Sequence, residues 1–189
     1  MINLEEVIEI DITQSQLDEH KTYYPYKAGS LKDAHTKKQE YGAMAEIVFR
    51  DFMKENYPKK KITPVKKEDN NGYTWVNCDY LINDKKVEVK GANIGVNQKP
   101  RTDWTCKHFK TSSHQKCDYY VFLRVREDFS KAYLLGMISK SDFESKSVFK
   151  KKGEYDEDSP KSKPFYYTAD TYTLPMTELT YKFKKKNDI

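Results

Sequence analysis

The sequence contains few of the residues that mark fibrous, disulfide-rich or membrane-spanning chains. Its 189 residues include only 7 Gly, 7 Pro and 3 Cys, and no CxxC pair occurs. So few Gly and Pro argue against a disordered or fibrous chain, and so few cysteines argue against a secreted disulfide framework. No apolar run approaches the roughly 18–20 residues that a membrane span requires. The length suits one domain, and we expect it to be soluble and intracellular.

Lys and Arg are absent from the first 20 positions, which carry six acidic side chains. This acidic start differs from the basic and then apolar start of a secretory signal peptide, so we expect a cytoplasmic protein. The net charge of +5 therefore combines an acidic start with a remainder of +11. A net charge this small does not by itself establish a nucleic-acid partner.

The hydrophobic pattern predicts an α/β (α+β) chain with the order helix, three strands, helix, strand, strand. We expect a core over about 38–138, an acidic N-terminal segment 1–36 and a C-terminal extension 140–189, all in one domain. The main helix is predicted over about 38–56, and a second, short helix within 104–115. The predicted strands are 7–12, 62–65, 73–82, 85–90, 119–125 and 132–138. Loops are predicted at 91–103 and 145–163, a helical turn from residue 141, and Tyr-rich strands within 165–183.

The two strands around residue 83 are predicted to form a hairpin that carries charged side chains on one face. Asn83-Asp84 is a good two-residue turn. With this turn, Asp79 lies opposite Glu88, and Lys90 points to the same face as Glu88. The other face is predicted to be a core face, made of Cys78, Tyr80, Ile82, Val87 and Val89.

Two carboxylates that face each other across a sheet repel, unless one is protonated or a cation lies between them. Carboxylate oxygens are ligands that Mg²⁺ and Mn²⁺ prefer, and the Val89 carbonyl could add another. Such an ion polarises a phosphoryl oxygen and activates a water. Lys90 could orient that water and stabilise charge developing on phosphorus. The alternative is an exposed hairpin with a solvated charged face.

The short motif is weak by itself, because four Asp/Glu-x-Lys triplets occur in the chain. Only Glu88-Val89-Lys90 combines an apolar middle residue, a following Gly, a strand and a facing Asp. A further carboxylate, Glu46, lies on the main helix over the small residues Gly42 and Ala43. These leave room for a ligand or another backbone. The alternative for Glu46 is a surface pair with Arg50 at i+4.

A Glu on the first core helix, an Asp on the second strand and Glu-x-Lys on the third strand resemble the PD-(D/E)xK nuclease superfamily. The resemblance covers about residues 38–126. It implies a restriction-endonuclease-like core, a central mixed sheet flanked by helices in the order α-β-β-β-α-β, with Mg²⁺- or Mn²⁺-dependent endonuclease activity on DNA. By this resemblance Glu46, Asp79, Glu88 and Lys90 are the catalytic residues, with Glu46, Asp79, Glu88 and Val89 as metal ligands. Cys78 stands where many members have Pro. A homodimer is a further option, and the subfamily stays open.

The segment that follows Lys90 is predicted to contact nucleic acid. Between residues 91 and 116 it carries five basic residues against one acidic residue. Basic side chains neutralise phosphates, Asn, Gln and Arg read base edges, and Trp stacks on unpaired bases. The resemblance adds a supporting role for one polar residue, Gln115, on the second helix. The predicted contact residues are Asn97, Gln98, Lys99, Arg101, Trp104, Lys107, Lys110 and Gln115.

Several alternatives stay open for these residues. The segment is otherwise a solvated loop, and Trp104 is otherwise a core residue that begins the second helix. Cys106, His108, His114 and Cys117 suggest zinc, although their spacing lacks the usual C-x2–4-C knuckle. An RNA nuclease and a non-catalytic nucleic-acid-binding or assembly protein on the same fold are the alternative functions.

Overall fold

The computed structural model describes residues 4–28, 35–65, 78–110, 116–156 and 166–186. Within these ranges the chain forms three α-helices, two short 3-10 helices and nine strands arranged in two sheets. None of the described helices is long and apolar enough to span a membrane. The helices are α1 (Gln14–Ala28), α2 (His35–Asn56) and α3 (Lys140–Lys146), and the 3-10 helices cover Leu4–Glu6 and Met176–Glu178.

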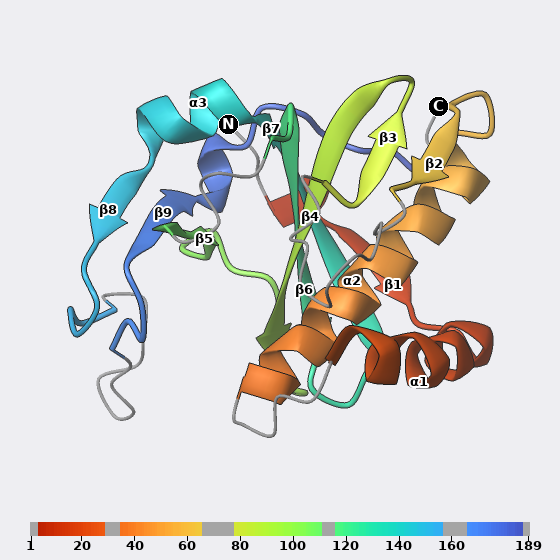
Figure 1. Cartoon of the computed structure of the whole chain (residues 1–189), viewed down its shortest axis with the longest axis horizontal. Coiled ribbons are helices and arrows are strands. Elements are labelled where there is room, and N and C mark those ends of the chain that lie inside the picture. Colours follow the sequence, from red (N-terminus) through yellow and green to blue (C-terminus); the bar gives the residue numbers. More distant parts are fainter. Residues whose placement is uncertain (1–3, 29–34, 66–77, 111–115, 157–165, 187–189) are drawn as a thin grey trace.

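A six-stranded mixed sheet forms the centre of the molecule (Figure 1). Its strand order is β1-β7-β6-β4-β3-β2, in which β4 pairs parallel to β6 and all other pairs are antiparallel. The parallel pair runs from Val87↔Tyr119 to Ile94↔Arg126. The strands are β1 (Ile8–Asp11), β2 (Ile62–Pro64), β3 (Tyr80–Ile82), β4 (Lys85–Ile94), β6 (Tyr119–Arg126) and β7 (Lys131–Ser139).

Helix α2 covers one face of this sheet because its apolar side chains recur at helical spacing. Met44, Val48 and Phe49 are fully buried against Val89 of β4 and Val121 of β6. The helix and β4 approach each other closely where both carry small residues. A Cβ added at Gly91 would lie 2.6 Å from the Ala45 Cβ and 3.0 Å from the Gly42 Cα. The close approach of β4 is therefore to the Gly42 Cα and to Ala45, whereas a Cβ added at Gly42 itself would have no neighbour within 4 Å.

The opposite face of the sheet is covered by a small three-stranded sheet and by α3 (Figure 1). The small sheet has the order β5-β9-β8 and is antiparallel throughout. Phe122 of β6 and Leu135 of β7 pack there against Cys106, Phe143 and Leu174. Its strands are β5 (Thr105–Phe109), β8 (Val148–Lys150) and β9 (Thr171–Pro175).

The predicted mixture of helices and strands is confirmed, but the second helix is wrong in the described part of 104–115. Residues 105–109 form strand β5 instead, and 111–115 lie outside the described residues. Cys106 and His108 are buried and their neighbours are not, which is the two-residue alternation of a strand. β5 forms because it pairs with β9, some 65 residues later in the chain.

Other boundaries also differ from the prediction. Strand β4 continues to Ile94, so the loop begins at Gly95, and β3 is described only from Tyr80 because 66–77 lie outside the described residues. The predicted loop 145–163 contains β8, and 157–165 are not described.

Helix α1 was not predicted, although Thr13-x-x-Gln16 is a capping-box signal. The Gln16 amide donates to the Thr13 Oγ1 (3.3 Å), and the Thr13 amide donates to the Gln16 Oε1 (3.0 Å).

Candidate functional site

The β3–β4 hairpin has the predicted turn and register. Tyr80 pairs with Val87 and Ile82 with Lys85, so paired numbers sum to 167. Asn83 and Asp84 both have positive φ (47° and 65°), as the central residues of a type I′ turn require. The turn chemistry therefore fixes which side chains share a face.

Asp79 lies just before β3 and is tied to β4 in two ways. Its backbone amide donates to the Val87 carbonyl (3.0 Å), and its Oδ2 accepts the Val89 amide (2.8 Å). The carboxylate thus extends the hydrogen-bonding edge of β4, and Asp79 is not a regular strand residue opposite Glu88. The same irregularity corrects the predicted core face, because Cys78 packs in the core beneath the small sheet while Tyr80 packs against α2.

Glu88 and Lys90 form an ion pair on the face of β4 that is turned away from α2. The Lys90 Nζ lies 2.8 Å from the Glu88 Oε1. Glu88 is 6% exposed, and a charge this far from water requires a close partner of opposite charge. The alternative of an exposed, solvated hairpin face is wrong for Glu88.

The charge of Glu88 influences three buried titratable groups. Burial raises the pKa of the Cys78 thiol to about 11, and the charges of Asp79 and Glu88 act in the same direction. Burial also raises the pKa of Cys117 and of the Tyr120 hydroxyl, and the Glu88 charge contributes to both. Asp79 and Glu88 therefore both raise the pKa of the Cys78 thiol.

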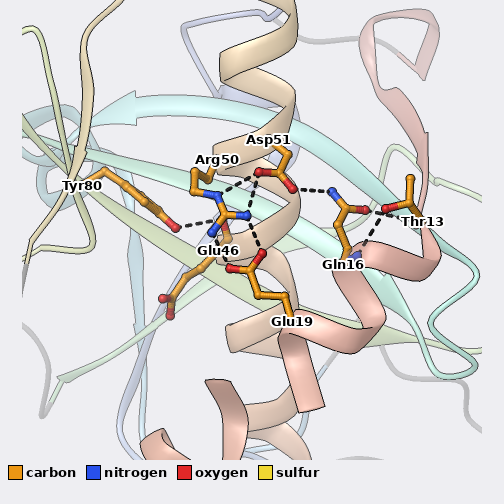
Figure 2. Close-up of polar contacts among 7 residues, drawn as sticks. All are labelled: Thr13, Gln16, Glu19, Glu46, Arg50, Asp51 and Tyr80. Atoms are coloured by element: carbon orange, nitrogen blue, oxygen red, sulfur yellow. Dashed lines mark hydrogen bonds and ion pairs between the residues drawn. The ribbon is translucent and has the colours of Figure 1, made fainter. Parts of the chain in front are cut away.

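Glu46 is buried (8% exposed) and does not form the surface pair with Arg50 that was the alternative reading. Arg50 instead forms a bidentate ion pair with Glu19 of α1 and also contacts Asp51. Figure 2 shows the Glu46 side chain extending away from the Arg50 guanidinium. The Tyr80 hydroxyl donates to the Glu46 backbone carbonyl (3.1 Å), which ties this turn of α2 to β3.

The predicted metal ligands are only partly brought together. Asp79, Glu88 and the Val89 backbone are adjacent, whereas α2, which carries Glu46, covers the opposite face of β4. Within the described ranges, no three His, Cys, Asp or Glu side chains are grouped to hold a metal ion. Cys106, His108 and Cys117, the described residues of the zinc alternative, are therefore not grouped to hold a metal ion. The fourth candidate, His114, lies outside the described residues.

Two neighbouring cavities lie on the Lys90 side of the sheet. A small cavity of about 40 Å³ is lined by Lys90, Gly91, Lys107 and Arg124 together with apolar residues of β5, β6 and β7. A larger groove of about 440 Å³ adjoins it, because Thr105, Lys107 and Arg124 line both. The groove carries four basic and two acidic side chains. Its lining residues are Asn93, Ile94, Asn97, Gln98, Lys99, Arg101, Asp103, Trp104, Thr105, Lys107, Arg124 and Asp156.

Six of the eight residues predicted to contact nucleic acid line this groove. Two are not placed there: Lys110 lies 5.3 Å from the ring centre of Phe149, and Gln115 is outside the described residues. Gln98 is used locally, since its Oε1 accepts the Gly95 amide (3.2 Å) and closes a turn. Trp104 precedes strand β5, so it does not begin a helix, but it is partly buried against the core and contacts Tyr133 edge-on, as the core alternative expected.

Arg124 and Asp156 are groove residues that the sequence analysis missed. Arg124 donates to the Thr105 carbonyl (2.7 Å), and its guanidinium lies 5.6 Å from the centre of the Trp104 ring. Arg124 is a charged residue within the otherwise apolar strand YYVFLRV, and this pattern could have identified it as a candidate site residue. Asp156 is buried and forms an ion pair with Lys107, for which local sequence gave no signal.

Comparisons with known proteins add no assignment, since no family model and no curated protein matches this chain.

Proposed function

We propose that this chain is a metal-dependent endonuclease that hydrolyses phosphodiester bonds in DNA, on a restriction-endonuclease-like core. The observation that carries the proposal is the ion pair between Lys90 and the buried Glu88, with the Asp79 carboxylate held beside it on the Val89 amide. A buried carboxylate paired with a lysine at the edge of a cavity lined by cations is suited to an anionic substrate.

The order of elements supports this core. Helix α2 is followed by three antiparallel strands, β2, β3 and β4, and then by β6 running parallel to β4. This agrees with the helix, three strands and later strand in a mixed sheet that the resemblance implies. The departure is the connection between β4 and β6, whose described part contains β5 in place of a helix.

The roles follow from where the groups lie. Lys90, Lys107 and Arg124 line the small cavity and would neutralise the phosphate held there. Lys90 would stabilise the charge that develops on phosphorus, and Glu88 keeps its ammonium in place. Asp79 is oriented by the Val89 amide, so its carboxylate needs no rearrangement to act.

The oxygen donors beside Lys90 are of the chemical type that binds Mg²⁺ or Mn²⁺. Asp79, Glu88 and the Val89 carbonyl are the hard oxygen ligands that these ions take, and they would hold the ion. A bound ion would supply an activated water and polarise the phosphate. Glu46, the further ligand that the resemblance implies, lies on α2, which packs on the face of β4 opposite Glu88.

Plasmid cleavage tests the proposal. Supercoiled plasmid is incubated with the protein and Mg²⁺ or Mn²⁺, with EDTA in parallel, and relaxed and linear forms are resolved on a gel. We expect cleavage that EDTA stops and that Glu88→Gln reduces at least about 100-fold, as for removal of a group that stabilises the transition state.

A matched control is available in another Glu-x-Lys triplet of the chain. Glu144→Gln changes the exposed carboxylate of Glu144-Ser145-Lys146 on α3 and should leave cleavage unchanged. Cleavage by Glu88→Gln at the wild-type rate would exclude this site. If the wild type cleaves neither DNA nor RNA under any of these conditions, the enzyme proposal fails.

A non-catalytic nucleic-acid-binding protein on the same fold is the second candidate. It is favoured by the lack, among the described residues, of three grouped metal-binding side chains. Metal-independent binding of DNA or RNA without turnover would select it. Parallel assays on both polymers separate a DNA nuclease from an RNA nuclease.

A further inference from the structure

We infer that the groove beside Lys90 holds one unpaired nucleotide of the substrate, so that the protein acts on single-stranded or locally unpaired nucleic acid in preference to intact duplex. This inference rests on the proposed function, because it names the substrate class of the same site. It depends on three properties of the groove: its size, its stacking surface and its distribution of charge.

The size of the groove suits a nucleotide. Its volume of about 440 Å³ lies within the roughly 300–1,000 Å³ of small-molecule sites. Bases in a duplex are stacked and paired, so a base enters a groove of this size only when the strand is single or the nucleotide is flipped out. A site built only for duplex backbone would need an open basic surface and no cavity of this kind.

Trp104 and Arg124 form a rigid stacking surface in the groove. The Arg124 guanidinium lies 5.6 Å from the Trp104 ring centre and is fixed by its bond to the Thr105 carbonyl (2.7 Å). The Trp104 backbone is held at both ends, its amide by the Arg101 carbonyl (3.2 Å) and its carbonyl by the Met176 amide (2.8 Å). Aromatic rings and guanidinium planes both stack on bases, and a preorganised surface loses little entropy on binding.

The charges of the groove are placed for a phosphate at each side of that base. Two of the four basic residues of the groove form ion pairs with its acidic residues, Arg101 with Asp103 and Lys107 with Asp156. Lys99 and Arg124 supply the excess positive charge. Lys99 lines the groove, is exposed and has no ion-pair partner within the described ranges.

At the other side of the groove, Lys107 and Arg124 also line the small cavity that contains Lys90. A strand whose base lies on Trp104 would therefore place its neighbouring phosphate beside Lys90.

The test measures binding in EDTA, so that cleavage plays no part. Fluorescein-labelled dT12 and the dT12·dA12 duplex are titrated with the full chain and followed by anisotropy. We expect at least tenfold tighter binding of the single strand. Trp104→Ala should weaken that binding by about 5- to 150-fold, the range for loss of one stacked base, and Trp104→Phe should retain most of it.

Two further variants keep the test informative if Trp104→Ala does not fold. Lys99→Gln changes an exposed groove lysine and should lower the slope of log affinity against log salt by about 0.7 for a single strand. The control is Lys59→Gln, which changes an exposed lysine just beyond α2 and outside the groove. It should change neither the affinity for dT12 nor the slope of log affinity against log salt.

Tryptophan fluorescence gives a direct readout, because Trp75 is the only other tryptophan. In a Trp75→Phe background, dT12 should quench Trp104 and the duplex should not. Equal binding of duplex and single strand, with no effect of Trp104→Ala or Lys99→Gln beyond that of Lys59→Gln, would overturn the inference.

The two proposals fail in different ways. Single-strand binding in the groove without cleavage in Mg²⁺ would remove the nuclease function and keep the groove assignment. Cleavage that depends on Glu88 while duplex binds as well as single strand would do the reverse.

Discussion

The contact between Gly91 and the first half of α2 predicts a large loss of stability for Gly91→Ala. The new Cβ would lie 2.6 Å from the Ala45 Cβ and 2.6 Å from the Tyr41 carbonyl oxygen, where ordinary contact begins at 3.4 Å. The helix would have to move back by about 0.8 Å from a close-packed sheet. Overpacking of this kind costs roughly 1–3 kcal/mol. We expect about 3 kcal/mol, because a backbone oxygen cannot rotate away.

Urea denaturation of matched variants measures this loss. Gly42→Ala is the control, because a Cβ there has no neighbour within 4 Å and Ala favours a helix over Gly by about 1 kcal/mol. In the background of Ala45→Gly, Gly91→Ala should be less destabilising but still unfavourable, since the contact with the Tyr41 oxygen remains. A Gly91→Ala protein as stable as the wild type would refute the close approach of β4 and α2.

Three further predictions concern the hairpin, the thiols and the α1–α2 contact. Asp79→Asn keeps an acceptor for the Val89 amide and should preserve stability. Asp79→Ala leaves that amide without its acceptor and should lower the free energy of unfolding by about 1–3 kcal/mol. Equal urea midpoints for the two variants would contradict this. All three cysteines are buried, and burial raises the pKa of Cys78 to about 11, so Ellman's reagent should label the folded chain slowly and the denatured chain at once. The hydrogen bond from Arg50 lowers the pKa of Glu19 in the folded protein. The ion pair therefore contributes its full stabilisation above the pKa that Glu19 has in the unfolded chain. This stabilisation is lost as the pH falls through the lower pKa of the folded protein. Between about pH 5 and pH 3 the free energy of unfolding should therefore fall more for the wild type than for Glu19→Gln. The difference should be under about 1 kcal/mol, because the Glu19 side chain is over a third exposed. Parallel curves of stability against pH would contradict the contact.

The parts of the fold that follow from local chemistry were predictable. The Asn83-Asp84 turn fixes the register of its hairpin, since both residues accept positive φ. The helical spacing of apolar residues located α2 from its core-facing side chains, with its start three residues earlier than predicted. Six of the predicted nucleic-acid contacts line one groove because they lie within a short stretch of chain.

The parts that depend on distant partners were not predictable. The five residues of β5 have too short an alternation to exclude a helix, and their partner β9 lies far along the chain. Asp156 reaches Lys107 only because the chain returns over the small sheet. The capping box at Thr13 is the exception, since that local signal for α1 was present in the sequence.

By itself the sequence determined that Glu88 and Lys90 share one face of a strand, because the two-residue turn sets the register and side chains alternate with a period of two. Asp79 lies outside that regular register, and only the structure shows its carboxylate on the Val89 amide. Only the tertiary structure decided what covers each face. The glycine after Lys90 lets α2 pack on one side and keeps Glu46 there, while β5 and β9 cover the other side and bring Lys107 and Arg124 to the cavity at Lys90. That choice rests on close packing between segments far apart in the chain, which no local pattern contains.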